Sequence, residues 1–218
     1  MECHQSLSLR HHCQNAKPLP DYAIIIGMPL PNIAIISSSI RTGRKSHGVA
    51  LYFQNLIRKK KLADVTMLDL KAMNFPLFEE RLKHLPTPPE SVVTFARHIV
   101  TADGILVVTP EYNAGYPAAL KNALDMLYDE WHRKPVAIAT GSEGAFGGAQ
   151  VRIALESVFS KMKALLVPAP FAVPHVEKAF TPEGVPTDPE HTDKRALVFI
   201  NELLYTIAMR KNTPNIPA

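Results

Sequence analysis

The sequence is poor in cysteine and has none after residue 13. Cys3 and Cys13 are the two cysteines of the 218-residue chain. The remainder therefore cannot form disulfides, ligate an iron–sulfur cluster or use a thiol nucleophile. Although His4, His11 and His12 lie beside these cysteines, their spacing matches no structural zinc pattern, so we expect no metal site.

Long hydrophobic runs and a strong charge excess are also absent. No run of 18 apolar residues occurs, so we expect no transmembrane helix and a cytoplasmic location. The formal net charge of +4 suits a protein that handles phosphorylated anions. It is too small and too scattered to indicate nucleic-acid binding.

The composition is that of one globular domain, with 46% hydrophobic and 20% charged residues. Residues 1–31 show no hydrophobic period, and we expect a disordered N-terminal tail there. The folded domain is predicted over residues 32–210, and residues 211–218 are expected to be a frayed C-terminal tail.

The most informative stretch is Gly104–Asp125, GILVVTPEYNAGYPAALKNALD. The apolar residues 105–108 predict a strand buried on both faces, and the apolar positions after Pro117 predict a helix. The polar turn at residues 109–117 therefore lies at the carboxyl end of a strand, where open α/β sheets bind ligands. The alternative is a solvated turn that only caps the helix.

This stretch resembles the NAD(P)H-dependent FMN reductases, a family of flavodoxin-like flavoproteins. PEYNAGYPAALKNALD is similar to their motif PEYN-x-x-YP-x-x-LKNALD. The resemblance implies that bound FMN carries the redox chemistry, and we assign no side chain as a catalytic acid or base. The cofactor-binding residues predicted in this turn are Pro110, Glu111, Tyr112, Asn113 and Gly115.

A phosphate site is predicted at residues 37–48, SSSIRTGRKSHG, between an apolar strand at 32–36 and a helix. Hydroxyls and cations beside a helix N-terminus favour a phosphate, whereas the alternative is a solvated helix start with Ser46 as N-cap. The segment is similar to the family's FMN-phosphate loop, GS-x-R-x-G-R-x-S, with Ser38 where a glycine is common. The predicted phosphate ligands are Ser39, Arg41, Arg44 and Ser46.

A third loop, TGSEGAFGGAQ at residues 140–150, follows the apolar strand 136–139 and precedes a helix to about Ala164. Its glycines allow the backbone to lie against a flat ligand and donate N–H groups, although a flexible surface loop is the alternative. The end of the loop resembles the family's GGA-x motif beside the flavin pyrimidine. The predicted contacts are Gly141, Gly144, Gly147 and Gly148.

The remaining elements follow from apolar period and proline content. The pattern predicts a strand at 63–69, a proline-bearing surface loop from Leu70, and a helix at 90–101. It also predicts a last strand at 165–173 that prolines interrupt. A linker-like loop at 180–193 and a closing helix at 194–209 complete the list.

Five strands that alternate with helices predict a parallel sheet with both faces covered, a flavodoxin-like α/β fold of strand order 2-1-3-4-5. The three polar loops follow strands 1, 3 and 4. The resemblance implies an oxidoreductase in which NADPH or NADH reduces bound FMN and leaves. A small acceptor such as free flavin, a quinone or an azo compound then takes the electrons in a ping-pong mechanism.

Two other functions stay open from the residues. One is a flavodoxin-like electron carrier, although such carriers are usually acidic and this chain is net basic. The other is a non-enzymatic interaction module without flavin. The resemblance also implies a homodimer, possibly a tetramer, with the flavins at the subunit boundary. An exposed apolar cluster at the end of the helix after Pro117 would support it: Met126, Leu127, Tyr128 and Trp131. The alternative is that these residues pack under the following loop.

Overall fold

The structure, a computed structural model, describes residues 29–213. The tail predicted for residues 1–31 lies almost entirely outside the described residues, as do both cysteines and residues 214–218. The strands are β1 (Asn32–Ser37), β2 (Asp64–Asp69), β3 (Gly104–Pro110), β4 (Pro135–Gly141), β5 (Leu165–Leu166) and β6 (Phe171–Val173). The helices are α1 (Ser46–Lys59), α2 (Leu70–Met73), α3 (Glu90–Thr101), α4 (Ala118–Asp125), α5 (Ala149–Lys161), α6 (Val176–Ala179) and α7 (Pro189–Asn212), with 3-10 turns η1 (Leu82–His84) and η2 (Asp129–Trp131).

All strand pairs are parallel, and the sheet order β2-β1-β3-β4-β5 confirms the predicted fold. The predicted last strand is two short segments, β5 and β6, that pair with opposite ends of β4. Pro168 and Pro170 lie between them, and proline cannot donate to the sheet ladder. The apolar runs therefore predicted the strands, and the flavodoxin-like fold that they suit predicted their order correctly.

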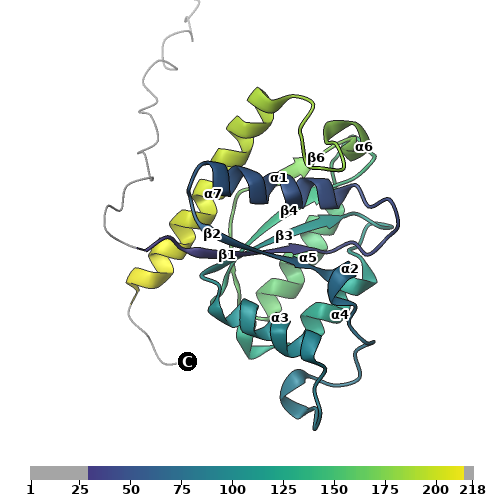
Figure 1. Cartoon of the computed structure of the whole chain (residues 1–218), viewed down its shortest axis with the longest axis vertical. Coiled ribbons are helices and arrows are strands. Elements are labelled where there is room, and N and C mark those ends of the chain that lie inside the picture. The colour runs from purple at the N-terminus through teal and green to yellow at the C-terminus, as the bar shows by residue number, and fades with distance from the viewer. Residues whose placement is uncertain (1–28, 214–218) are drawn as a thin grey trace, which may run out of the picture.

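Each face of the sheet has its own hydrophobic core. Alternate strand residues such as Ile33, Ile35 and Leu106 face α1 and α7, whereas Ile36 and Val107 face α3, α4 and α5. Figure 1 shows α1 and α7 on one side of the sheet and α3 and α4 on the other. Because both faces are buried, the strands are apolar throughout, as is typical of parallel sheets.

Three helical segments differ from the prediction. The helix α7 begins at Pro189, not Lys194, because Asp188 caps it by accepting from the His191 N–H and proline suits the first helical turn. It ends at Asn212, beyond the predicted domain end at 210. The predicted surface loop from Leu70 contains α2 and η1, since the Asp69 carboxylate accepts from the Lys71 N–H and starts α2. Helix α5 ends at Lys161, three residues before the predicted end.

Candidate functional site

The carboxyl ends of β1, β3 and β4 meet at one edge of the sheet, and the three predicted loops start there. Ser37 pairs with Val108 of β3, and Pro110 pairs with Gly141 at the end of β4. The segments 38–45, 111–117 and 142–148 consequently lie next to one another. In open α/β sheets, ligands bind beside the carboxyl ends of the strands, and these three segments lie there.

The loop after β1 contains buried hydroxyls that the protein does not satisfy. Ser38 Oγ and Ser46 Oγ are buried and have no hydrogen-bond partner within the described part of the chain. Ser46 is the first residue of α1, and the first N–H groups of a helix have no carbonyl one turn before them, although the Gly48 N–H donates to the Lys45 carbonyl over 3.1 Å. Leaving a buried hydroxyl unpaired costs about 1–3 kcal/mol, so this site fits a bound oxyanion such as a phosphate.

The structure overturns the alternative in which Ser46 caps α1. The N-cap residue is Lys45, which has helical backbone angles and no side-chain cap hydrogen bond. The Ser46 hydroxyl therefore does not serve the helix start, and the predicted role as a phosphate ligand stays available to it. Ser38, which departs from the family motif, shares this property and was missing from the predicted ligands. The sequence feature that could have indicated Ser38 is its position between Ser37 and Ser39.

Arg44 is engaged within the protein. Its guanidinium donates to both carboxylate oxygens of Asp69 and, over 2.9 Å, to the Ser39 carbonyl. Burial alone would raise the pKa of Asp69, but the Arg44 and Lys71 hydrogen bonds bring it below its usual value. Arg44 thus ties the loop after β1 to the end of β2. Arg41, in contrast, has an exposed side chain.

His47 lies beside this clamp and contacts the end of β1. Its Nδ1 is 2.9 Å from the Ser37 hydroxyl. Burial and the neighbouring Arg44 charge lower the pKa of His47. A neutral imidazole adds no charge beside the loop and can form a hydrogen bond with Ser37 in either direction.

The loop after β3 forms a tight turn. Tyr112 and Gly115 exchange two backbone hydrogen bonds of 2.8 and 2.9 Å, and Asn113 and Ala114 both have positive φ angles of 49° and 63°. These are the angles of a type I′ turn. The Tyr112 hydroxyl lies 2.7 Å from Ser39 Oγ. The turn is thereby joined to the loop after β1, and two predicted site residues meet.

Glu111 has a structural partner that the sequence did not indicate. One of its carboxylate oxygens accepts from the backbone N–H groups of Gln150 and Val151, each over 3.0 Å. These N–H groups belong to the first turn of α5, where a negative charge is stabilised by the helix dipole. Glu111 therefore caps α5 and fixes the loop after β3 against the loop after β4.

Two of the four predicted glycines are required by the protein's own packing. Gly147 and Gly148 have φ angles of 60° and 89°, and a Cβ on either would lie 2.9 Å from atoms of the chain. Gly141 belongs to β4, and a Cβ there would meet Val176 at 3.1 Å. Gly144 has open space around it, with Ser142 Oγ the one atom near the position of its Cβ, at 3.8 Å. The two ends of the loop, at Gly141 and at Gly147 and Gly148, are thus closely packed, whereas residues 143–146 between them are exposed.

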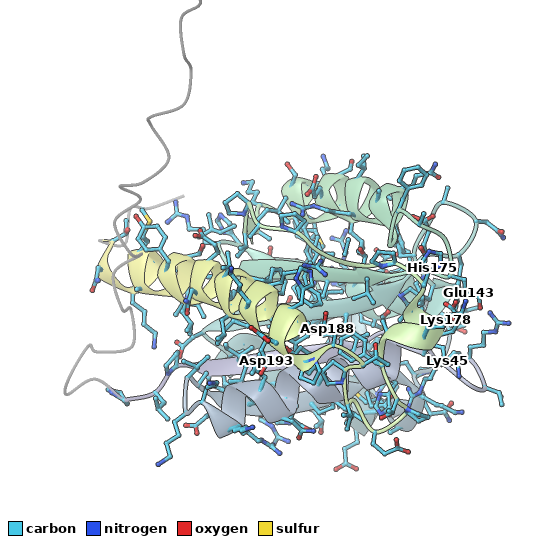
Figure 2. The ribbon with its side chains drawn as sticks, turned by 90° about the horizontal axis from the view of Figure 1, so that it is seen from above. Lys45, Glu143, His175, Lys178, Asp188 and Asp193 are labelled. Carbon is cyan, nitrogen blue, oxygen red and sulfur yellow. The ribbon has the colours of Figure 1, made fainter. Side chains whose placement is uncertain are left out.

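Charged side chains from three segments surround this edge. Figure 2 shows Lys45 from the start of α1, Glu143 from the loop after β4, and His175 and Lys178 from α6 on the same side of the molecule. The helix α6 is held there because Val176 N–H donates to the Ser142 carbonyl over 3.0 Å. The edge therefore carries charges of both signs around the buried hydroxyls.

Asn122 is a further residue that sequence reasoning did not single out. Its side chain donates to the Pro76 carbonyl over 2.8 Å and accepts from the Phe78 N–H over 2.7 Å. It thereby fastens the segment after α2 to α4. The asparagine of the LKNALD motif is the signal that could have indicated this position.

The predicted apolar interface cluster is wrong. Met126, Leu127 and Trp131 are at most 2% exposed and pack in the core under α3, α4 and α5. The helix α4 ends at Asp125, and η2 turns Trp131 inward, where its indole N–H donates to the Leu124 carbonyl. These residues give no support to association. Within residues 29–213, no helix is long and apolar enough to cross a membrane.

The fold is that of a flavodoxin-like α/β protein, and two buried hydroxyls without a partner among the described residues lie at the start of its first helix. The family model of the NADPH-dependent FMN reductases matches residues 31–178. An NAD(P)H-dependent FMN reductase of Saccharomyces cerevisiae is 35% identical over 144 residues, which are 60% of this chain and 74% of the relative. A quinone reductase of Escherichia coli K12 is 35% identical over 101 residues, 44% of this chain and 54% of that protein.

A solved structure is also similar to this chain. The flavoenzyme NAD(P)H:(acceptor) oxidoreductase of Paracoccus denitrificans matches with a TM-score of 0.69 and 26% identity over 83% of this chain and 99% of that one. The chain belongs to the NADPH-dependent FMN reductase family. It is accordingly an FMN- and NAD(P)H-dependent oxidoreductase, as the resemblance of its motifs implied.

Proposed function

We propose that this chain binds FMN at the carboxyl edge of the sheet and reduces small acceptors such as quinones, free flavin or azo compounds with electrons from NADPH or NADH. When bound, FMN supplies the redox chemistry of the reaction. The observation that carries the proposal is the pair of buried, unpartnered hydroxyls of Ser38 and Ser46 beside the start of α1. A phosphate there would satisfy both groups and the free N–H groups of the helix.

The surrounding residues have distinct parts in this proposal. Ser38, Ser39 and Ser46 donate to the phosphate, and the exposed Arg41 contributes positive charge. Arg44 holds the loop in shape through Asp69 instead of binding the phosphate itself.

The turn at residues 110–115 and the glycines of residues 141–148 place the flavin ring and exclude water from it. No side chain of the site is assigned a proton-transfer role. In the ping-pong mechanism that we propose, the nucleotide would leave before the acceptor enters. We also propose a homodimer, which light scattering at micromolar concentration tests against the 24.1 kDa monomer.

Flavin binding tests the proposal most directly. The Ser46→Ala variant should bind FMN about tenfold more weakly, while riboflavin, which lacks the phosphate, binds as before. The apo protein should keep or raise its melting temperature, because an unsatisfied buried hydroxyl is removed. Ser157→Ala, on the exposed side of α5, is the matched control and should change neither affinity.

Two results would contradict the proposal in different ways. Equal weakening of FMN and riboflavin by Ser46→Ala would place the phosphate elsewhere. A wild-type protein that binds no FMN, or that oxidises no NADPH or NADH in the presence of FMN and a quinone, would exclude the function itself.

A further inference from the structure

The loop after β4 exposes a large aromatic side chain beside the proposed flavin site. Phe146 is 85% exposed, more than any other large apolar side chain in the described part of the chain. Burial of a phenylalanine is a main source of folding free energy, and here that contribution is absent. Stability therefore does not account for a phenylalanine at this position.

The exposure does not come from a loose loop. The Thr140 hydroxyl donates to the Gly147 carbonyl over 2.7 Å, and the Gly144 carbonyl accepts from the N–H groups of Gly147 and His175. Gly147 also packs so closely on the segment after β6 that no Cβ fits. The backbone on both sides of Phe146 is thus anchored, and the ring is held out into solvent.

The loop that carries Phe146 lies beside the proposed flavin site. Its loop starts at the end of β4, beside β3, and the carboxylate of Glu111 holds the next helix to the turn after β3. On the other side of β3, the loop after β1 presents Ile40, which is 52% exposed. The loops on the two sides of this turn, which we assign to the flavin ring, therefore each carry one exposed apolar side chain.

We propose that Phe146 is a specificity-determining residue that forms one wall of the acceptor site and favours flat, apolar acceptors of the quinone class. This inference rests on the proposed function. An exposed aromatic ring at the edge of the site offers a stacking surface to a planar acceptor. Overall, NADPH, one proton and a quinone become NADP⁺ and a hydroquinone, so electrons and atoms balance.

Acceptor kinetics of the full-length, FMN-loaded enzyme test the proposal. In Phe146→Ala the KM for menadione, an apolar quinone, should rise about tenfold, while the KM for ferricyanide stays within twofold. The rate of anaerobic reduction by NADPH and the affinity for FMN should also stay within twofold. Phe146→Tyr, which keeps the ring, should restore the menadione KM. Ile153→Ala, which removes a 68% exposed side chain on α5, is the matched control and should change nothing.

Three outcomes would overturn the inference. An unchanged menadione KM in Phe146→Ala, with normal FMN binding and NADPH oxidation, would do so while the proposed function stands. A slower reduction by NADPH would assign the ring to the nucleotide, and a change in molecular mass by light scattering would assign it to a subunit contact. Failure of the wild-type enzyme to bind FMN or oxidise NADPH would instead remove the proposed function.

Discussion

The two edges of the sheet use buried polar groups in opposite ways. At the amino edge, the buried Lys134 donates to the carbonyls of Val100 and Ala102 over 3.0 and 2.6 Å. Asp103 accepts from the Asn32 N–H and pairs with Lys211 of α7. These polar groups have partners within the chain and so contribute to the stability of the fold.

At the carboxyl edge the same kind of group lacks a partner. Ser38 Oγ and Ser46 Oγ are as well buried as Lys134 but have no partner among the described residues. An enzyme that binds an anion must keep donors free, and free buried donors cost stability until the ligand arrives. Buried polar groups at the amino edge therefore stabilise the fold, whereas those at the carboxyl edge remain available to bind a ligand.

Arg44 tests the comparison between the two edges most strongly, because it lies at the carboxyl edge but donates hydrogen bonds to Asp69 and to the Ser39 carbonyl. Arg44→Met should destabilise the apo protein by about 2 kcal/mol, because Asp69 and the Ser39 carbonyl lose their charged donor and the pair is partly screened by water. The loop after β1 should then lose its shape, and FMN affinity should fall by about 30-fold, a loss on the order of 2 kcal/mol. Chemical denaturation and FMN titration measure the two effects.

Lys45→Met is the matched control for Arg44, since it removes an exposed charge from the next residue. It should lower FMN affinity less than threefold. Asp69→Asn combined with Arg44→Met should cost little more than Arg44→Met alone, because the two side chains act as one unit. Additive losses, or equal effects of Arg44→Met and Lys45→Met, would show that Arg44 acts as a simple charge.

Lys134 tests the amino edge. Lys134→Met should cost about 2 kcal/mol, because two buried carbonyls lose their donor, and FMN affinity should not change. Burial, aided by the Arg210 charge, lowers the pKa of Lys134 to about 8. Between pH 8 and about 10.5 the unfolded chain binds a proton that the folded chain releases. The stability of the wild type should therefore rise with pH in this window relative to Lys134→Met.

Denaturation curves at pH 7.5 and 10 measure this difference. Lys194→Met, which changes an exposed lysine of α7, serves as the control and should leave both stability and its pH dependence within 0.5 kcal/mol of the wild type, roughly the range of surface substitutions. A fall in FMN affinity for Lys134→Met would contradict the separation of the two edges.

The strands and the loops at their ends could be predicted, because they depend on residues that are close together in the sequence. The apolar runs predicted the strands, and the flavodoxin-like fold that they suit gave the strand order. Three polar loops at strand ends predicted the edge of the sheet where Ser39 and Tyr112 meet, although 73 positions separate these residues. The start of α7 was missed although Asp188 and Pro189 are an ordinary helix-start signal, because the prolines around them indicated a linker.

Partners could not be predicted, because they depend on how distant segments pack. Nothing near Arg44 in the sequence indicates Asp69, which is 25 positions away, and nothing near Glu111 indicates the start of α5, which is 39 positions away. The apolar residues around Trp131 looked exposed because α4 was extended through them. The chain leaves the helix at Asp125 and folds them into the core.

Substitution of Glu111 should have the smallest effect on stability and FMN affinity. It also tests whether a residue at the carboxyl edge transfers a proton. The carboxylate caps α5, and a glutamine of the same shape can still accept from the Gln150 and Val151 N–H groups without its charge. Glu111→Gln should therefore cost about 1 kcal/mol and weaken FMN binding by about threefold. Glu156→Gln, which removes one charge of a partly buried i,i+4 ion pair with Arg152 on the same helix, should cost only about 0.3 kcal/mol. Because hydride moves between the nicotinamide and the flavin, the pH dependence of anaerobic reduction by NADPH should be the same in Glu111→Gln and the wild type. A stopped-flow series from pH 5.5 to 8.5 decides this: loss of a titration near neutrality in the variant would make Glu111 an acid or base, and the carboxyl edge would then do more than bind and orient.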